Sequence, residues 1–375
     1  MIPESPLTEA HRAAGAELAH HAGEEFGVLL PAQFRASSHG AQAEHETART
    51  SVGLIDTNFR AVFHLTGADR VRYFNAVTTG NIRDLKTGQS ALGLLLNPQG
   101  HVLAELLTLA MEDRLVILGH QMRRAGTMQT LDKFIIMDDA ALTDETDGTC
   151  TVAIEGPAAS RVLQDLVGIT LEQIAPGGHA TANVTSSGAA IPCHVLRHSL
   201  FGYPGVEILA AREAVHRLWS AASEAVRAHG GAPIGYRALN MLRLEAGVPW
   251  FGAEFDEQHI PHEAGLEKTH ISFTKGCYTG QEIVERVRSR GHVNRRLTGL
   301  RFDTTEPPAP GALLMAEGTD VGQVTSAAFS PLLGSAIGMG YLRREYQQPG
   351  TVLECGSMRV EAIELPLAAA APTSA

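Results

Sequence analysis

Hydrophobic and polar positions follow two periods along this chain, and the segments that carry them occur twice in the same order. In the first copy a β-rich segment over residues 60–65 ends at a turn with Gly, and a helical pattern follows over 70–77. In the second copy the β-rich segment covers 151–155 and the helical pattern covers 161–167. Each copy continues with short β segments and a second helix, as in the ferredoxin-like order. The pattern predicts an α+β fold with two ferredoxin-like units, which could interleave in space.

Beyond Arg295 the pattern changes to short β segments separated by Gly and Pro. Six such segments in succession are typical of a small barrel, so we expect a C-terminal six-stranded β-barrel. A long connection over 250–280 precedes it, and loops of that length in compact proteins are usually functional. The connection contains His259, His262 and His270, whose spacing matches no zinc pattern, so we interpret them as loop polarity.

These patterns divide the chain into five parts. Residues 1–25 have the composition of a polar, Ala-rich helix, in which His11 is expected to be solvated. The last eight residues are expected to fray. The predicted parts are an N-terminal helical extension (1–27), a first α+β unit (28–148), a second such unit (149–292), the β-barrel (293–366) and a disordered tail (367–375).

Composition narrows the function classes. The chain has 375 residues, 44% of them hydrophobic, and a formal charge of −11, which argues against broad, non-specific nucleic-acid binding. No apolar run is long enough to span a bilayer, and the N-terminus lacks the pattern of a signal peptide. We therefore expect a cytoplasmic protein without membrane contact, and a monomer. Its four cysteines form no CxxC pair, which argues against a disulfide framework and a four-cysteine zinc site.

The segment from Lys275 to Glu282, with the sequence KGCYTGQE, carries the clearest chemical signal. Glycines on both sides of Cys277 predict an exposed turn just before a helix that begins at Gln281. A positive helix end and the nearby Lys275 favour thiolate over thiol. We predict Cys277 and Lys275 as catalytic residues, with Cys277 able to attack an electrophile or to ligate an iron–sulfur cluster. The other three cysteines are interpreted as buried apolar residues.

The predicted helix after this segment is basic although the chain is acidic. Its acids, Glu282 and Glu285, neutralise it incompletely. Such a cluster suits phosphate, a carboxylate tail, an acidic partner or a tRNA backbone. We rank direct tRNA contact below the other uses. The basic residues are Arg286, Arg288, Arg290, Arg295 and Arg296.

The KGCYTGQE segment resembles the signature of the YgfZ folate-binding proteins. A wider resemblance to the aminomethyltransferases (glycine cleavage T-proteins) covers roughly 45–365, including the LRLEAG segment over 242–247. That resemblance implies three domains in a ring, tetrahydrofolate in a central channel, and Glu245 at the pterin edge. The further folate-binding residues that we expect are Phe59, Arg60, Leu239, Tyr278, Gln281, Glu207 and Arg290.

The chain also departs from the T-protein pattern. Where that pattern has two successive aspartates, this chain has Ala104 and Glu105, and Ala104 cannot accept a proton. We therefore predict a protein other than a glycine-cleavage aminomethyltransferase. The predicted function is to bind tetrahydrofolate and to support assembly or repair of iron–sulfur enzymes, and through them tRNA modification. Its partners would be iron–sulfur client enzymes or carrier proteins.

Two alternatives stay open. One is a folate-dependent one-carbon transferase or demethylase, in which Glu105 or His101 replaces the missing aspartate. The other is a binding module in which folate is only a structural or sensory ligand.

Overall fold

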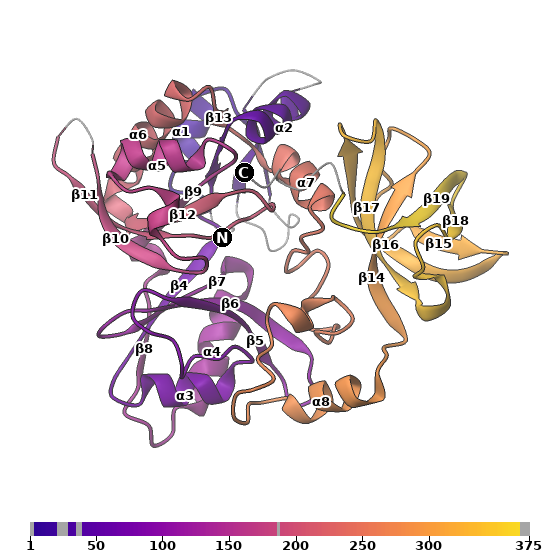
Figure 1. Cartoon of the computed structure of the whole chain (residues 1–375), viewed down its shortest axis with the longest axis horizontal. Helices are drawn as coiled ribbons and strands as arrows, with labels where there is room; N and C mark the ends of the chain where they lie inside the picture. The colour runs from indigo at the N-terminus through magenta and orange to yellow at the C-terminus, as the bar shows by residue number, and fades with distance from the viewer. Residues whose placement is uncertain (1–3, 21–28, 35–39, 186–187, 368–375) are drawn as a thin grey trace.

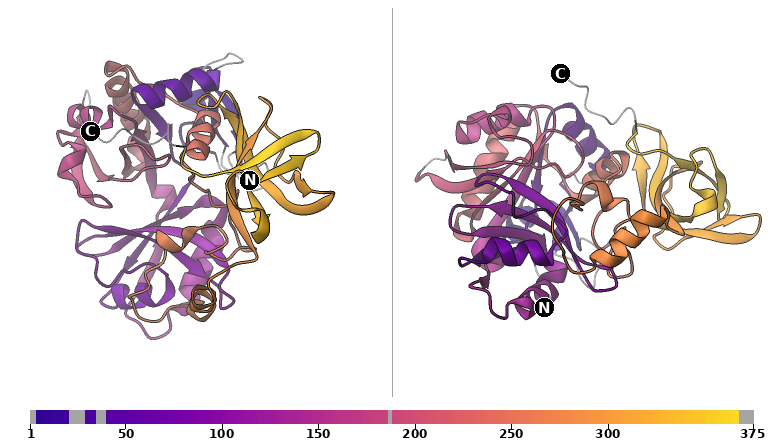
Figure 2. Two further views of the ribbon diagram at one scale, coloured as in Figure 1. Left: turned by 45° about the vertical axis from the view of Figure 1, so that its right-hand side comes forward. Right: turned by 60° about the horizontal axis from the view of Figure 1, so that its bottom comes forward.

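The computed structural model describes residues 4–20, 29–34, 40–185 and 188–367. Two α+β units lie side by side, and a β-barrel lies beside them (Figure 1). The helix α8 (Gln281–Arg290) lies at the edge of the first unit and leads directly into the barrel. The turned views show the same three bodies grouped around a shared centre (Figure 2).

The first unit is a five-stranded sheet in the order β5-β6-β7-β4-β8, covered by helices on one face. Its strands alternate apolar side chains between the two faces, and Phe63, Phe74 and Leu131 join the sheet to its helices in one buried core. The elements are β4 (Arg60–Thr66), α3 (Arg70–Val77), β5 (Ser90–Leu96), β6 (Val102–Ala110), β7 (Leu115–His120), α4 (Arg124–Phe134) and β8 (Ala141–Asp144).

The second unit repeats this arrangement in a six-stranded sheet in the order β10-β11-β12-β9-β3-β13. Both units have three antiparallel strands between their two helices, one more than the ferredoxin-like order requires. The elements are β3 (Gly53–Asp56), β9 (Thr149–Glu155), α5 (Ala159–Val167), β10 (His179–Val184), β11 (Ile191–Leu196), β12 (Gly205–Ala211), α6 (Val215–Ala228) and β13 (Ala232–Pro233).

The two sheets pack against each other through their helix-free faces. Val62, Leu107 and Leu118 of the first sheet meet Leu196 and Leu209 of the second in one buried cluster. Each sheet is therefore buried on both faces, which explains why its strands are almost continuously apolar. This shared layer fixes the position of one unit against the other.

The C-terminal strands close into a barrel in the order β14-β17-β16-β15-β18-β19. The predicted fold class is confirmed, including the six-stranded barrel. The helix α7 (Tyr236–Glu245) docks on the barrel, where Leu244 packs against Ile337 and Met339. The barrel strands are β14 (Arg295–Phe302), β15 (Leu313–Ala316), β16 (Thr319–Ser330), β17 (Ser335–Arg343), β18 (Val352–Cys355) and β19 (Met358–Ile363).

The N-terminal extension differs from the predicted helix. Within the described residues 4–20, helix α1 is confined to Thr8–Ala13, and β1 (Glu17–His20) then pairs with β2 (Leu29–Gln33). Gly15 adopts a φ of +78°, a left-handed conformation that ends the helix whatever the alanine content around it. His11 is buried rather than solvated, with Nε2 at 2.8 Å from Asp56 Oδ2.

Segments from each side of the predicted border between the two units pack on the other unit. The helix α2 (Gly40–Thr50) and β3 precede the first unit in sequence but pack on the second. The sequence predicts residues 250–290 as part of the second unit, yet Phe255, Tyr278 and Val284 share a core with β5 and β6 of the first. Hydrophobic periodicity shows that a segment buries a face, but it does not show which neighbour covers that face.

Apart from Leu367, the predicted tail lies outside the described residues. In the described part of the chain, no helix combines the length and apolar character needed to cross a bilayer.

Candidate functional site

A cavity of about 770 Å³ lies where the two units, the long connection and the barrel meet. The first unit contributes Arg60 and Glu105, and the second contributes His198 from the loop after β11. The connection contributes His270, and the barrel contributes Met339. A concave site with few polar groups among apolar walls is the usual form of a small-molecule site.

An arginine and a glutamate from different sheets form an ion pair at the base of the cavity. Arg60 at the start of β4 donates from Nε and Nη2 to the two carboxylate oxygens of Glu207 in β12, each at 3.0 Å. Burial opposes both charges, but the mutual attraction outweighs it. The pKa of Arg60 is raised and the pKa of Glu207 is lowered, so both stay ionised.

A second carboxylate faces the cavity from β6. Glu105 Oε1 lies 2.9 Å from Nε2 of His270, whose backbone carbonyl accepts a hydrogen bond from Thr79 at 2.6 Å. Burial acts to raise the pKa of Glu105, but the hydrogen bond and charge of His270, together with Arg60, lower it overall. Because side chains alternate along a strand, the neighbouring Ala104 points into the core of the first unit instead.

Two further histidines line the cavity in neutral form. Burial, reinforced by the charge of Arg60, lowers the pKa of His198 to about 4 and that of His120 to about 3. At neutral pH the polar walls therefore combine an ionised Glu105, neutral imidazoles and a guanidinium that Glu207 balances. The arrangement favours a cationic or polarised ligand near Glu105.

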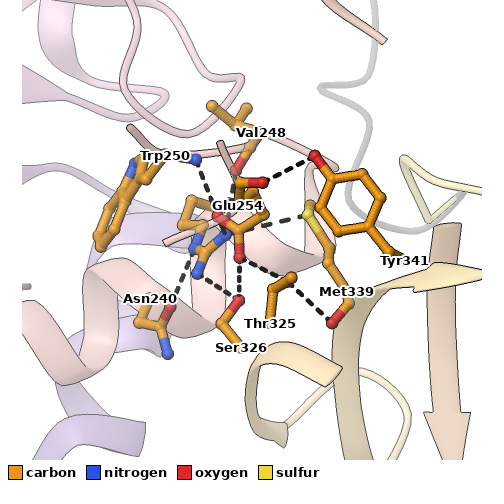
Figure 3. A network of polar contacts seen from close by, with 9 residues as sticks. Asn240, Val248, Trp250, Glu254, Thr325, Ser326, Met339 and Tyr341 are labelled. Atoms are coloured by element: carbon orange, nitrogen blue, oxygen red, sulfur yellow. Dashed lines mark hydrogen bonds and ion pairs between the residues drawn. The ribbon is translucent and has the colours of Figure 1, made fainter. Parts of the chain in front are cut away.

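Aromatic rings adjoin these polar groups along the cavity. The Phe59 and Tyr236 rings make an edge contact with centroids 6.1 Å apart, and Tyr236 meets Trp250 at 5.9 Å. The guanidinium of Arg243 stacks on Trp250 at 4.7 Å and forms a buried ion pair with Glu254 at 2.6 Å. Figure 3 shows how this network joins Trp250 and Asn240 to Ser326 and Thr325 of the barrel. The network holds the aromatic wall between α7 and the barrel.

The predicted folate-binding residues divide into two groups. Phe59, Arg60 and Leu239 line the cavity, and Glu207 lies directly behind Arg60. Glu245 is not among the lining residues, which corrects its predicted place at the pterin edge. It is buried between α2, α7 and the barrel, where it bonds to His45 at 2.7 Å and Ser330 at 2.6 Å. Each of its oxygens bonds within the protein and the residue is buried, so Glu245 joins α2, α7 and the barrel.

The KGCYTGQE segment anchors a loop to the first unit. The ammonium of Lys275 donates to the carbonyls of Asn75, Thr78 and Gly80 at 2.5, 2.5 and 2.7 Å, at the end of α3. Tyr278 is buried beside β5, and its backbone N–H is 3.4 Å from Gln281 Oε1. Lys275, Tyr278 and Gln281 are therefore absent from the cavity lining.

Cys277 is exposed, as predicted, but it does not line the cavity. The other cysteines, Cys150, Cys193 and Cys355, are buried, which confirms their interpretation as apolar core residues. Among the described residues, no group of three or more His, Cys, Asp or Glu side chains is placed to hold a metal ion.

The basic residues around α8 are paired with carboxylates. Arg286 pairs with Glu282 at 2.9 Å, and Arg288 contacts Glu285 at 3.4 Å. Arg295 and Arg296 pair in the same way with Glu263 and Glu267 of the connection. Arg290 ends α8, and its side chain lies outside the described atoms. The pairs offset the positive charge on which the prediction of tRNA contact rests, and that contact stays a prediction.

Sequence reasoning missed the histidines of the cavity. His270 was interpreted as loop polarity, and His120 and His198 were not singled out. Each stands at the end of a strand or in a long connection, which is where side chains converge on a site. Their position at strand ends and in the long connection is the signal that the sequence offers for them. It could not reveal that His270 meets Glu105 across 165 residues.

The comparisons with known proteins agree with this architecture. The profile of the GCVT N-terminal domain matches residues 7–275, and that of the glycine cleavage T-protein C-terminal barrel domain matches 295–366. An aminomethyltransferase of Desulforamulus reducens is 28% identical over 356 residues, covering 94% of this chain and 93% of the relative. One of Rubrobacter xylanophilus is 30% identical over 344 residues, covering 92% and 88%.

A solved structure shows the same fold. The glycine cleavage system aminomethyltransferase T from Bartonella henselae superposes with a TM-score of 0.86 over 99% of both chains, at 22% identity. These relatives do not confirm the narrower YgfZ-type assignment.

Two predictions are wrong in the light of these relatives. A role in iron–sulfur enzyme assembly, and through it in tRNA modification, is overturned because relatives along nearly the whole chain are named aminomethyltransferase. The prediction that the chain is not a glycine-cleavage aminomethyltransferase fails for the same reason. It rested on Ala104 and gave too little weight to Glu105, which faces the cavity. The two domain matches show that this chain belongs to the glycine cleavage T-protein family.

Proposed function

We propose that this protein transfers the one-carbon unit of an aminomethyl donor to tetrahydrofolate in the cavity between its three domains. The observation that carries the proposal is the ionised Glu105, held by His270 on a wall of a 770 Å³ cavity. The names of the relatives support the same reaction class, and their family uses tetrahydrofolate as a substrate.

The chemistry needs a carboxylate at this place. When the neutral amine of an aminomethyl group uses its lone pair to expel the donor, a positive charge develops that the nitrogen and the carbon share. A carboxylate in a partly dry cavity stabilises such a cation strongly, because little water screens it. His270 orients Glu105, and the neutral His198 avoids adding a competing positive charge.

The reaction balances without an oxidant. For a donor that carries the group on sulfur, the S–CH₂ bond and the bond from the carbon to the amine nitrogen break, and the carbon forms two bonds to N5 and N10 of tetrahydrofolate. Those nitrogens lose one proton each, one to the departing sulfur and one to the amine, which leaves as ammonium. The products are a thiol, 5,10-methylene-tetrahydrofolate and ammonium.

The test is turnover by the purified full chain. It is incubated with tetrahydrofolate and an aminomethyl thioether donor, and in parallel with methylated amines such as sarcosine. The expected result is 5,10-methylene-tetrahydrofolate and ammonium in equal amounts from the aminomethyl donor. Turnover of the methylated amine alone would establish the demethylase alternative, which requires an added electron acceptor.

Folate binding without turnover of any donor would overturn the transferase proposal. The Lys275–Glu282 segment would then support a narrower proposal, in which the chain stands with the YgfZ-type members as a binding protein.

A further inference from the structure

We propose that Glu155, a buried carboxylate outside the cavity, positions the loop over residues 199–203 and thereby sets the place of Leu200 in the cavity wall. Glu155 is a positioning residue in this arrangement, because it acts on the ligand only through Leu200. The inference rests on the proposed function and adds a residue, remote from the ligand, on which folate affinity depends.

One carboxylate gathers the hydrogen-bond donors of this loop. Glu155 is the last residue of β9 and is buried. Its Oε1 accepts hydrogen bonds from Ser199 Oγ at 2.6 Å and from the backbone N–H groups of Phe201 and Tyr203, each at 3.0 Å. Its Oε2 accepts from the backbone N–H of Leu200 at 2.6 Å and from no other donor in the described part of the chain. The two oxygens therefore hold different parts of the loop, and Oε2 holds Leu200.

The loop that Glu155 holds forms part of the cavity wall. Leu200 lines the cavity and packs in one apolar cluster with Leu239 and Tyr236 of α7. Phe201 belongs to the same cluster and is fully buried, so the loop is packed between the end of β9 and α7. Glu155 itself is not among the residues that line the cavity. A shift of the loop would therefore change the wall where the second unit meets α7.

The four hydrogen bonds depend on the chemical form of the Glu155 side chain. Burial raises the pKa of Glu155 to about 7, and the hydrogen bonds from the loop act to lower it. At pH 8 the group is therefore mostly ionised and can accept all four bonds. A carboxylate accepts on both oxygens, whereas an amide of the same shape accepts on one side and donates on the other. Exchanging the carboxylate for an amide thus changes the side of the group that holds Leu200.

The informative variant is Glu155→Gln in the full chain at pH 8. Its amide oxygen can keep the three donors that Oε1 holds, but its NH₂ group then faces the N–H of Leu200, and the two donors repel each other. We expect the dissociation constant of 5-formyl-tetrahydrofolate, measured by calorimetry, to rise about tenfold, which is the effect of one unsatisfied buried donor. The KM for tetrahydrofolate should rise to the same degree. The kcat should stay within about twofold, because Glu105 and His270 belong to the first unit and the connection.

A double-mutant cycle separates positioning from a general loss of structure. Leu200→Ala removes the side chain through which Glu155 acts, so adding Glu155→Gln to it should change the dissociation constant by less than about twofold. Gly205→Ala disturbs the same carboxylate from β12, because an added Cβ would lie 2.8 Å from Cγ of Glu155, and it should also weaken binding. Asp303→Asn is the matched control. The Asp303 carboxylate also accepts a backbone N–H bond, from Arg359, but neither residue lines the cavity.

Each outcome decides the inference. Weaker binding by Glu155→Gln that disappears in the Leu200→Ala background, with Asp303→Asn like the wild type, supports it. Wild-type affinity in Glu155→Gln overturns it and leaves the proposed function standing, as does an effect that persists in the Leu200→Ala background or a loss of kcat at unchanged KM. If Glu155→Gln does not fold, Gly205→Ala decides in its place, with weaker binding at unchanged kcat in support and unchanged binding against. Failure of the wild-type protein to bind the folate overturns the proposed function and the inference together.

Discussion

The KGCYTGQE segment and the cavity wall use polar residues in opposite ways. In the segment, the three donors of Lys275 are consumed by three backbone carbonyls, and Tyr278 is buried. In the wall, Glu105 and Arg60 each have a partner but also line open space. Polar groups with saturated partners hold a fold together, whereas groups with spare capacity beside a cavity can act on a ligand. The most conspicuous stretch of sequence is therefore an anchor.

The two regions are nevertheless connected. Thr79 binds the backbone of His270, and Lys275 binds the carbonyls on both sides of Thr79. Ser272 N–H also donates to Thr79 O at 2.9 Å. The anchor thus holds the 270–275 stretch against the first unit, and that stretch places His270 beside Glu105.

The strongest test of this difference between the two regions is to replace the reactive side chain of each. Glu105→Gln is expected to lower kcat by about a hundredfold or more, because the carboxylate that stabilises the cation is lost. Cys277→Ser is expected to leave kcat within about twofold. Initial rates of 5,10-methylene-tetrahydrofolate formation measure both. Asp165→Asn is the matched control, since Asp165 also pairs with a histidine, His229, but far from the cavity. If Glu105→Gln kept the wild-type kcat while Cys277→Ser lost activity, the comparison of the two regions would be reversed.

Removing the anchor should act mainly on stability. Lys275→Met leaves three carbonyls without their donor, and we expect the free energy of unfolding to fall by about 3 kcal/mol. Urea unfolding measures the change, and Lys268→Met, at an exposed lysine of the same connection, should stay within about 0.5 kcal/mol. If the Lys275 variant unfolds like the wild type, the anchoring role is wrong.

Two glycines of the KGCYTGQE segment differ in how much room an added side chain would have. Gly280 has a φ of +81°, and an added Cβ would lie 2.7 Å from the carbonyl oxygen of Asn97. Gly280→Ala is expected to destabilise by about 2 kcal/mol. An added Cβ at Gly276 meets nothing within 4 Å, so Gly276→Ala should change stability by less than about 0.5 kcal/mol. Equal melting temperatures for the two variants would contradict the close approach at Gly280.

The smallest expected effect is that of His198, on the cavity wall, on the pH dependence of stability. The folded state lowers the pKa of His198 from 6.5 to about 4, so between these values the unfolded chain binds more protons. Stability should therefore be complete above about pH 6.5 and decline as the pH falls toward 4, with His198 responsible for about 1–2 kcal/mol. His198→Asn should flatten this part of the curve in urea unfolding. His216→Asn, at an exposed histidine of α6, should keep the pH dependence of the wild type. If the His198 variant also kept it, His198 would not be the group responsible for the loss of stability.

Local patterns predicted the parts of the fold well. The repeat and the six barrel strands depend on periodicity and on Gly and Pro, which act over a few residues. The candidate site was predicted only in part. Phe59, Arg60 and Leu239, which we predict as folate contacts, line the cavity, and their contact with folate stays a prediction. Glu245 instead joins domains, and the interpretation of His270 as loop polarity misses its place at the cavity.

The sequence by itself determined the elements, the twofold repetition and the membership of a large folate-related family, because each depends on residue types and their spacing. Only the tertiary structure decided which polar groups meet, since pairs such as Arg60 with Glu207 and Glu105 with His270 join positions 147 and 165 residues apart. A charge acts through distance and burial, and both are set by how the sheets and the barrel pack. Polar residues of the same type therefore became an anchor in one place and a ligand-facing wall in another.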